Sequence, residues 1–134
     1  MKKIVTLLTV LSLLVIFSSG TCMAAFWKKS HVNVITKEQL LKKIAAGNVQ
    51  VVNVLSPDFY NLGSISGSKK IPLHELDKRA GELDKSKEVV TYCASYKCRA
   101  SREAAIKLKK MGFDVSAYEG GIKEWKDSHL PTEA

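Results

Sequence analysis

Two cysteines and two cationic side chains fall within one seven-residue segment of this 134-residue chain, Cys93-Ala94-Ser95-Tyr96-Lys97-Cys98-Arg99. A cysteine attacks as the thiolate, and an unperturbed thiol with a pKa of about 8.5 is mostly protonated at neutral pH. A following helix N-terminus and nearby positive charges lower that pKa. We therefore expect Lys97 and Arg99 to keep Cys93 ionised and nucleophilic. The alternative interpretation is that Cys93 is a small buried apolar residue at the end of a strand.

The second thiol, Cys98, has two interpretations that the sequence leaves open. A curled loop would bring Cys98 near Cys93, where it would resolve a sulfur adduct and leave a disulfide. Equally, Cys98 is the first apolar residue of the next helix or an idle thiol, because a disulfide needs Cα atoms about 4.4–6.8 Å apart and sequence spacing does not set that distance. Two thiols without His or further Cys partners fall short of a closed metal site, so we expect no metal and no cofactor.

The elements on either side of this segment place it at the edge of a sheet. The segment 88–92 is β-branched and aromatic and is the strongest predicted strand. Apolar positions from Ala100 to Met111 follow a helical period, and Gly112 ends that helix. In parallel α/β sheets, ligands bind at the carboxyl ends of the strands, where the next helix presents free backbone N–H groups. Cys93 stands at such a position.

The rest of the chain alternates short strands with helices. We predict a strand over 32–35, then a helix to about residue 46 with a capping box of Thr36 and Gln39 and a stop at Gly47. Further strands are predicted over 49–55, 70–73 and 115–118, with helices over 74–83 and around Trp125. This alternation predicts an α/β fold with a mostly parallel sheet.

The N-terminus has the layout of a cleavable secretory signal peptide over residues 1–24. Two lysines precede an apolar stretch from Ile4 to Phe17, which is shorter than the roughly 18–20 residues needed to span a bilayer. Cleavage after Ala24 would remove 24 of the 134 residues and leave 110, residues 25–134, as a single domain. A lipoprotein acylated at Cys22 is the less favoured alternative.

Export has consequences for charge, location and partners. The loss of Lys2 and Lys3 would lower the net charge from +8 to +6. The remaining lysines are spread along the chain without interleaved aromatic residues, so we do not expect nucleic-acid binding. We predict a periplasmic or secreted protein that meets the membrane only through the signal segment if it stays uncleaved. Its cysteines would then lie in a compartment that oxidises thiols.

Three ordered segments resemble the signature regions of rhodanese-like domains. The first comprises residues 53–60, 63–67 and 71–72, the second residues 89–93 with the helix that follows, and the third residues 118–122 with Trp125 and residues 130–131. The resemblance implies a five-stranded parallel sheet flanked by helices on both faces. It also implies a sulfurtransferase in which Cys93 takes sulfane sulfur as a persulfide from a donor such as thiosulfate and hands it to an acceptor.

The same resemblance implies the surroundings and partners of Cys93. Backbone N–H groups of the loop would cradle the substrate anion, with a binding set of Ala94, Ser95, Tyr96, Lys97 and Arg99. Ser101 is either a further donor to the anion or a helix-capping hydroxyl. The expected partners are a small sulfur-containing anion or persulfide donor and a thiol acceptor such as an exported thioredoxin-like reductant.

The chain also departs from the family pattern. Asn53 and Leu55 stand where the first signature usually has Asp and Arg, and Ser64 stands where it often has His. We interpret these changes as a missing ion pair and not as lost chemistry. The active loop is longer than the common six residues, lacks the usual glycine and contains the second thiol. The cradle on the substrate side is therefore expected to have a different shape.

Two other function classes remain as alternatives. Five residues separate Cys93 from Arg99, which is the spacing that rhodanese-fold phosphatases and arsenate reductases use to hold an oxyanion. Against this, Tyr92 stands where such loops have His, and Ala100 where they commonly have Ser or Thr. The third class is a non-catalytic module that binds a partner through the same cleft, against which the retained Cys93 argues.

Overall fold

The structure, a computed structural model, describes residues 31–134. The predicted signal peptide, its cleavage after Ala24 and the lipidation alternative at Cys22 all lie outside the described residues. Between residues 31 and 134, no helix is both long enough and apolar enough to cross a membrane.

One parallel sheet of five strands, in the order β1-β6-β5-β2-β4, organises the fold. The strands are β1 Asn33–Val34, β2 Val49–Asn53, β4 Lys69–Lys70, β5 Glu88–Tyr92 and β6 Val115–Tyr118. Strand β5 is central, with Thr91 opposite Val52 of β2 on one side and Ala117 of β6 on the other. Its bounds match the prediction, and its nearly continuous apolar sequence reflects burial on both faces. The predicted five-stranded parallel sheet is confirmed.

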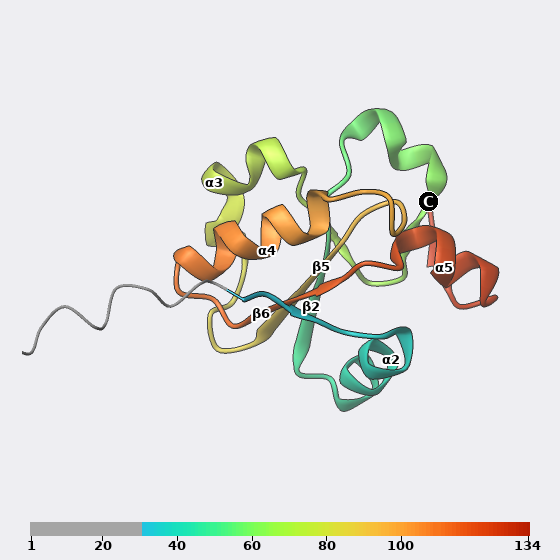
Figure 1. The fold of residues 1–134 in the computed structure, drawn as a ribbon, viewed down its shortest axis with the longest axis horizontal. Helices are drawn as coiled ribbons and strands as arrows, with labels where there is room; N and C mark the ends of the chain where they lie inside the picture. The colour runs from blue at the N-terminus through green and yellow to red at the C-terminus, as the bar shows by residue number, and fades with distance from the viewer. Residues whose placement is uncertain (1–30) are drawn as a thin grey trace, which may run out of the picture.

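Helices cover the two faces of this sheet. They are α2 Lys37–Ala46, α3 Leu76–Arg79, α4 Ala100–Lys110 and α5 Gly121–Asp127. Figure 1 shows α3 and α4 on one side of the sheet and α2 on the other. Helix α5 lies next to α2, where Lys37 Nζ donates to Ser128 Oγ over 2.8 Å. The prediction of helices on both faces is therefore confirmed.

Local capping signals define the ends of α2 as predicted. The Thr36 hydroxyl accepts the backbone N–H of Gln39, and the Gln39 side chain accepts the N–H of Thr36. Gly47 ends the helix in the left-handed conformation with φ 74° and returns its N–H to Ile44. Within α2, Leu40 is fully buried but Ile44 remains exposed.

The hydrophobic core lies on both sides of β5 and β2 and holds the end of β5 rigidly. Val52, Val89 and Val90 of these strands are completely buried, as is Leu108 of α4. Trp125 is buried and packs edge-on against the Tyr118 ring with centroids 6.2 Å apart. A side chain at the carboxyl end of β5 is therefore held by well-packed neighbours.

Some elements differ from the prediction. The helix expected over 74–83 is instead a 3-10 turn Leu73–Glu75, the short α3, and a second 3-10 turn Ala80–Glu82. Gly81 weakens the helix near its end. The strand expected over 70–73 ends at Lys70, and Pro72, which lacks a backbone donor, follows soon after.

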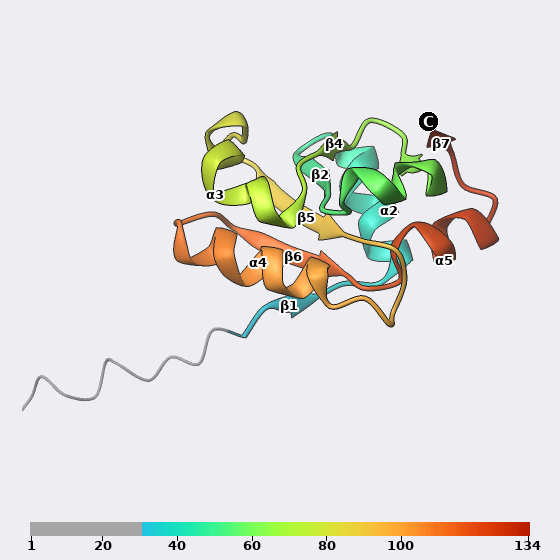
Figure 2. The same cartoon turned by 90° about the horizontal axis from the view of Figure 1, so that it is seen from above.

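Two further features were not predicted. Residues Pro57–Leu62 form a 3-10 helix after β2. Strands β3 Ser64–Ile65 and β7 Thr132–Glu133 form a small antiparallel sheet. Figure 2 shows the C-terminal segment running from α5 to β7. The two strands are only two residues long and lie far apart in sequence, so no local periodicity reveals their pairing.

Candidate active site

Cys93 lies at the carboxyl end of the central strand, at the start of the loop that leads from β5 to α4 (Figure 1). The loop is closed at its base, because Thr91 Oγ1 in β5 donates to the carbonyl oxygen of Ser101 in the first turn of α4 over 2.7 Å. The predicted position of Cys93 between a strand end and a helix start is therefore confirmed.

The state of the Cys93 thiol differs from the prediction. Cys93 is fully buried, and its Sγ–H donates to the carbonyl oxygen of Cys98 over 3.3 Å. Burial raises the pKa of Cys93 from 9.0 to about 11, and the nearby Cys98 thiol acts in the same direction. Only the backbone N–H and the hydroxyl of Ser101 favour the thiolate. The expected lowering of the pKa is thus wrong for this conformation, because desolvation outweighs the helix terminus.

The two predicted cations do not offset that burial. Lys97 and Arg99 are both exposed, and Arg99 stands at the N-cap position of α4. Water screens an exposed charge, so its effect on a buried sulfur is weak. Neither residue is among the causes of the shifted Cys93 pKa.

The loop backbone is folded on itself instead of forming an open cradle. Ser95 accepts the N–H of Cys98 at its carbonyl oxygen over 2.9 Å and the N–H of Lys97 at its hydroxyl over 3.4 Å. Two N–H groups assigned to anion binding are therefore directed at Ser95. In this conformation Ser95 forms a turn, and its role in substrate binding stays a prediction.

The loop does bring the two cysteines together. Both are free thiols; Cys93 is buried and Cys98 is half-buried. The five-residue spacing, closed by the Ser95 turn, places the Cys98 backbone against the Cys93 sulfur. Cys98 precedes α4 and lies near Cys93, so it is not the first residue of that helix, and its role as a resolving thiol stays a prediction.

Ser101 is the most informative polar neighbour of Cys93. Ser101 is fully buried. Among residues 31–134, its Oγ is the one buried side-chain oxygen or nitrogen atom without a hydrogen-bond partner. It does not cap α4, whose N-cap residue is Arg99. Because an unsatisfied buried hydroxyl costs about 1–3 kcal/mol, such a group indicates a missing partner. The adjacent sulfur, or a group attached to it, is the natural acceptor.

Helix α5 holds the first part of the loop through its backbone. The N–H of Ile122 donates to the carbonyl oxygen of Cys93, and that of Lys123 to the carbonyl oxygen of Ala94, each over 2.9 Å. Gly121 makes this approach possible with φ 65°, and a Cβ there would lie 2.5 Å from the Cys93 oxygen. The glycine pair of the closing signature is therefore part of the site, although the site prediction did not include it.

The tip of the loop is tied to the same helix by side chains. Tyr96, 67% exposed, donates its hydroxyl to Glu124 Oε1 over 3.2 Å. The buried Tyr118 donates to Glu124 Oε2 over 2.6 Å. Glu124 thus joins the loop tip to the end of β6. Nothing in the local sequence indicates this role, because the three residues belong to three different elements.

A hydrogen bond between two neutral side chains joins two of the positions at which this chain departs from the family pattern. The fully buried Asn53 donates from Nδ2 to Ser64 Oγ over 3.0 Å, and its Oδ1 accepts the N–H of Leu55 over 3.0 Å. The pair links the end of β2 to β3. These contacts agree with the interpretation of a missing ion pair at a structural position.

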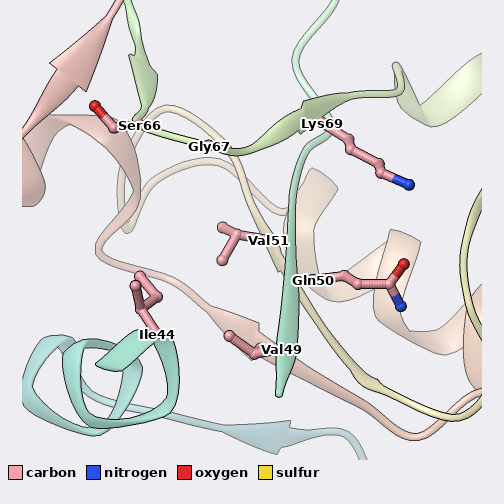
Figure 3. Close-up of a pocket in the computed structure, with 7 residues that line it drawn as sticks. All are labelled: Ile44, Val49, Gln50, Val51, Ser66, Gly67 and Lys69. Carbon is pink, nitrogen blue, oxygen red and sulfur yellow. The ribbon is translucent and has the colours of Figure 1, made fainter. Parts of the chain in front are cut away.

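A separate pocket of about 290 Å³ lies beside β2, away from the active loop. Figure 3 shows Ile44, Val49 and Val51 on one side of β2, with Gln50 and Lys69 on the other. Lys69 Nζ donates to the carbonyl oxygen of Glu82. No residue of 93–99 lines this pocket, so it has no part in the chemistry of Cys93. The described part of the chain contains no cluster of three or more His, Cys, Asp or Glu residues placed to hold a metal.

Comparison with known proteins agrees with this arrangement. Residues 36–128 match the family described as the Rhodanese-like domain. A sulfurtransferase of Allochromatium vinosum is 31% identical over 77% of this chain and 96% of its own length. A thiosulfate sulfurtransferase of Pseudomonas paraeruginosa is 31% identical over 63% of this chain and 76% of its own. An HTH-type transcriptional regulator of Mycobacterium tuberculosis is 32% identical over 78% of this chain, which spans only 46% of that longer protein.

A solved structure shows the same fold. A protein from Lactobacillus plantarum superposes with a TM-score of 0.69 and 27% identity, over 99% of this chain and 98% of that one.

Proposed function

Because this chain belongs to the rhodanese-like family, whose members similar to it include sulfurtransferases, we propose that it carries sulfane sulfur as a persulfide on Cys93 and passes it to a thiophilic acceptor. One observation carries the proposal. The Cys93 sulfur lies at the carboxyl end of the central strand, facing the backbone N–H and the otherwise unpartnered hydroxyl of Ser101. These donors stabilise negative charge on sulfur.

The proposed transfer has two steps. In the first, the Cys93 thiolate attacks the outer sulfur of a donor such as thiosulfate; the new S–S bond forms as the donor S–S bond breaks, and sulfite leaves with the electron pair. In the second, an acceptor thiolate attacks the outer sulfur of the persulfide and returns Cys93 as a thiolate. Division into two substitutions is covalent catalysis, and each step leaves an anion for the Ser101 donors to stabilise.

The described conformation is the resting state in this proposal. Its Cys93 thiol is buried, and the raised pKa keeps that thiol protonated at neutral pH. Reaction therefore requires the loop to open, which exposes the sulfur and lowers its desolvation penalty. The contacts that must break are few: the bond from Cys93 to Cys98, the Ser95 turn and the exposed bond from Tyr96 to Glu124. Opening would also release the N–H groups of the turn to the donor anion.

The location and partners form a second part of the proposal. The signal-like N-terminus supports a periplasmic or secreted protein. Its donor would be a small sulfur-containing anion or a persulfide, and its acceptor a thiol, such as one on an exported thioredoxin-like reductant. A direct measurement is the location and N-terminal residue of the protein expressed with its natural start. Retention in the cytoplasm with Met1 intact would contradict export.

Intact mass tests the chemistry directly. The reduced protein is incubated with thiosulfate or a polysulfide, and its mass is measured before and after cyanide. We expect Cys93 to gain one sulfur atom in a form that cyanide removes, and Cys93→Ser to gain none. Turnover of an aryl phosphate or of arsenate without any sulfur adduct would instead indicate the oxyanion chemistry that the Cys93 to Arg99 spacing suggested. If neither reaction occurs, the catalytic assignment is wrong and the partner-binding module remains.

A further inference from the structure

The active loop brings the backbone of Cys98 against the Cys93 sulfur. The Cys93 Sγ–H points at the carbonyl oxygen of Cys98, 3.3 Å away. Neither cysteine is in a disulfide in the structure, and the half-buried Cys98 is the more accessible of the two. A solvent-borne reductant therefore reaches Cys98 more readily than Cys93.

The fold holds this arrangement from both ends of the loop. On the strand side, helix α5 binds the carbonyl oxygens of Cys93 and Ala94 through the N–H groups of Ile122 and Lys123. On the helix side, the Ser95 carbonyl accepts the N–H of Cys98 and turns the chain back toward Cys93. A reaction between groups held this way is intramolecular and does not depend on a collision with an external thiol.

We propose that Cys98 is a resolving thiol that releases the sulfur of a Cys93 persulfide as hydrogen sulfide. This inference rests on the proposed function, and it deepens that function by naming the product and the acceptor. It makes the chain a reductase of sulfane sulfur as well as a carrier.

The step balances within the loop. Cys98 sulfur attacks Cys93 Sγ, the inner sulfur of the persulfide. The bond between the two cysteines forms as the bond to the outer sulfur breaks, and that sulfur leaves as hydrosulfide and takes up the Cys98 proton. The outer sulfur gains two electrons, and the two cysteine sulfurs, now a disulfide, supply them. A dithiol reductant of the thioredoxin type then reduces the disulfide and restores both thiols.

The experiment uses the full chain, reduced and then freed of reductant without exposure to air. Wild type, Cys98→Ser and Cys93→Ser each receive one equivalent of a polysulfide. Released sulfide is measured beside a protein-free blank, and intact mass is measured after free thiols are blocked. Cys98→Ala serves as a second variant, and thermal unfolding identifies any variant that has failed to fold.

The expected results separate the two proposals. Wild type should release about one equivalent of sulfide and end as a Cys93–Cys98 disulfide, lighter by two hydrogen atoms and protected from blocking. Cys98→Ser should instead retain a stable sulfur adduct on Cys93 and lose the sulfide release. If wild type keeps the adduct and releases no more sulfide than Cys98→Ser, the resolving role is overturned and the proposed function stands. If folded Cys98→Ser takes up no sulfur at all, the proposed function itself fails.

Discussion

Gly121 lies so close to the carbonyl oxygen of Cys93 that a Cβ on it would stand 2.5 Å from that oxygen. The same Cβ would meet the carbonyl carbon and oxygen of Ala94 at 2.7 and 2.8 Å. These are backbone atoms, which cannot rotate away as the end of a flexible side chain can. The shape of the active loop therefore depends on the absence of a side chain in α5.

Gly121→Ala should accordingly displace the loop and destabilise the fold. The matched control is Gly47→Ala, because Gly47 has a similar φ of 74° but open space where its Cβ would lie. We expect Gly47→Ala to lose about 1–2 kcal/mol from the left-handed backbone alone, and Gly121→Ala to lose clearly more. Urea unfolding measures both, and sulfur loading of Cys93 should fall only in Gly121→Ala. Equal losses in the two variants would show that the contact with Cys93 has no energetic weight.

Ser101→Ala should change reactivity and stability in opposite directions. Removal of a buried hydroxyl without a partner should leave the free energy of unfolding unchanged or raise it by up to about 1 kcal/mol. The same change removes a donor to the Cys93 thiolate, so the pKa of Cys93 should rise and alkylation of Cys93 should slow. Rates of iodoacetamide modification against pH, followed by mass, give the test.

The control for Ser101→Ala is Ser116→Ala. Ser116 is also a buried serine, but its hydroxyl donates to Glu88 over 2.8 Å at the other end of the sheet. Ser116→Ala should lose stability, but its alkylation profile for Cys93 should match that of wild type. An unchanged alkylation profile in Ser101→Ala would show that Ser101 does not stabilise the Cys93 thiolate.

Tyr96→Phe should open the loop without weakening the core. The bond from Tyr96 to Glu124 is exposed, so its loss should change the free energy of unfolding by less than about 1 kcal/mol. Because that bond ties the loop tip to α5, we expect faster alkylation of Cys93 and faster sulfur loading in the variant. The rate of Cys93 alkylation, measured by quenching the reaction at several times at a fixed pH below the thiol pKa, tests this prediction.

A comparison with Glu124→Ala shows whether the tether acts through Tyr96. That variant frees the loop tip too, but it also leaves the buried Tyr118 hydroxyl without its acceptor. It should therefore lose stability by about 1–3 kcal/mol while it speeds labelling. If neither variant labels Cys93 faster than wild type, the tether does not control access.

The raised pKa of Cys93 predicts how stability depends on alkaline pH. Burial raises this pKa from 9.0 to about 11, so the folded protein holds the thiol proton more tightly than the unfolded chain does. The corresponding stabilisation is fully present below about pH 9 and is lost as pH rises through about 11. We expect the free energy of unfolding of wild type to fall more steeply over this range than that of Cys93→Ser. Parallel curves would mean that folding leaves the pKa of this thiol unchanged.

The sequence pattern predicted an element correctly where the interactions that form it are between neighbouring residues. The capping box of Thr36 and Gln39 and the strand 88–92 depend on neighbouring residues and on periodicity, and both appear in the structure as predicted. The position of Cys93 between a strand and a helix follows from the same signals. The helix predicted over 74–83 is broken into short turns. The prediction used the spacing of apolar residues, which does not take account of the low helix propensity of Gly81.

The sequence by itself determined the α/β order of elements, the family and the position of Cys93 at the end of the central strand. Only the tertiary structure decided the direction in which the pKa of Cys93 shifts, because desolvation depends on how the loop folds over Cys93 and not on which charges stand beside it in the chain. Tertiary structure also decided which groups surround it. Gly121 and Glu124 reach the loop from α5, and the more than twenty residues that separate α5 from the loop leave no local pattern by which to pair them.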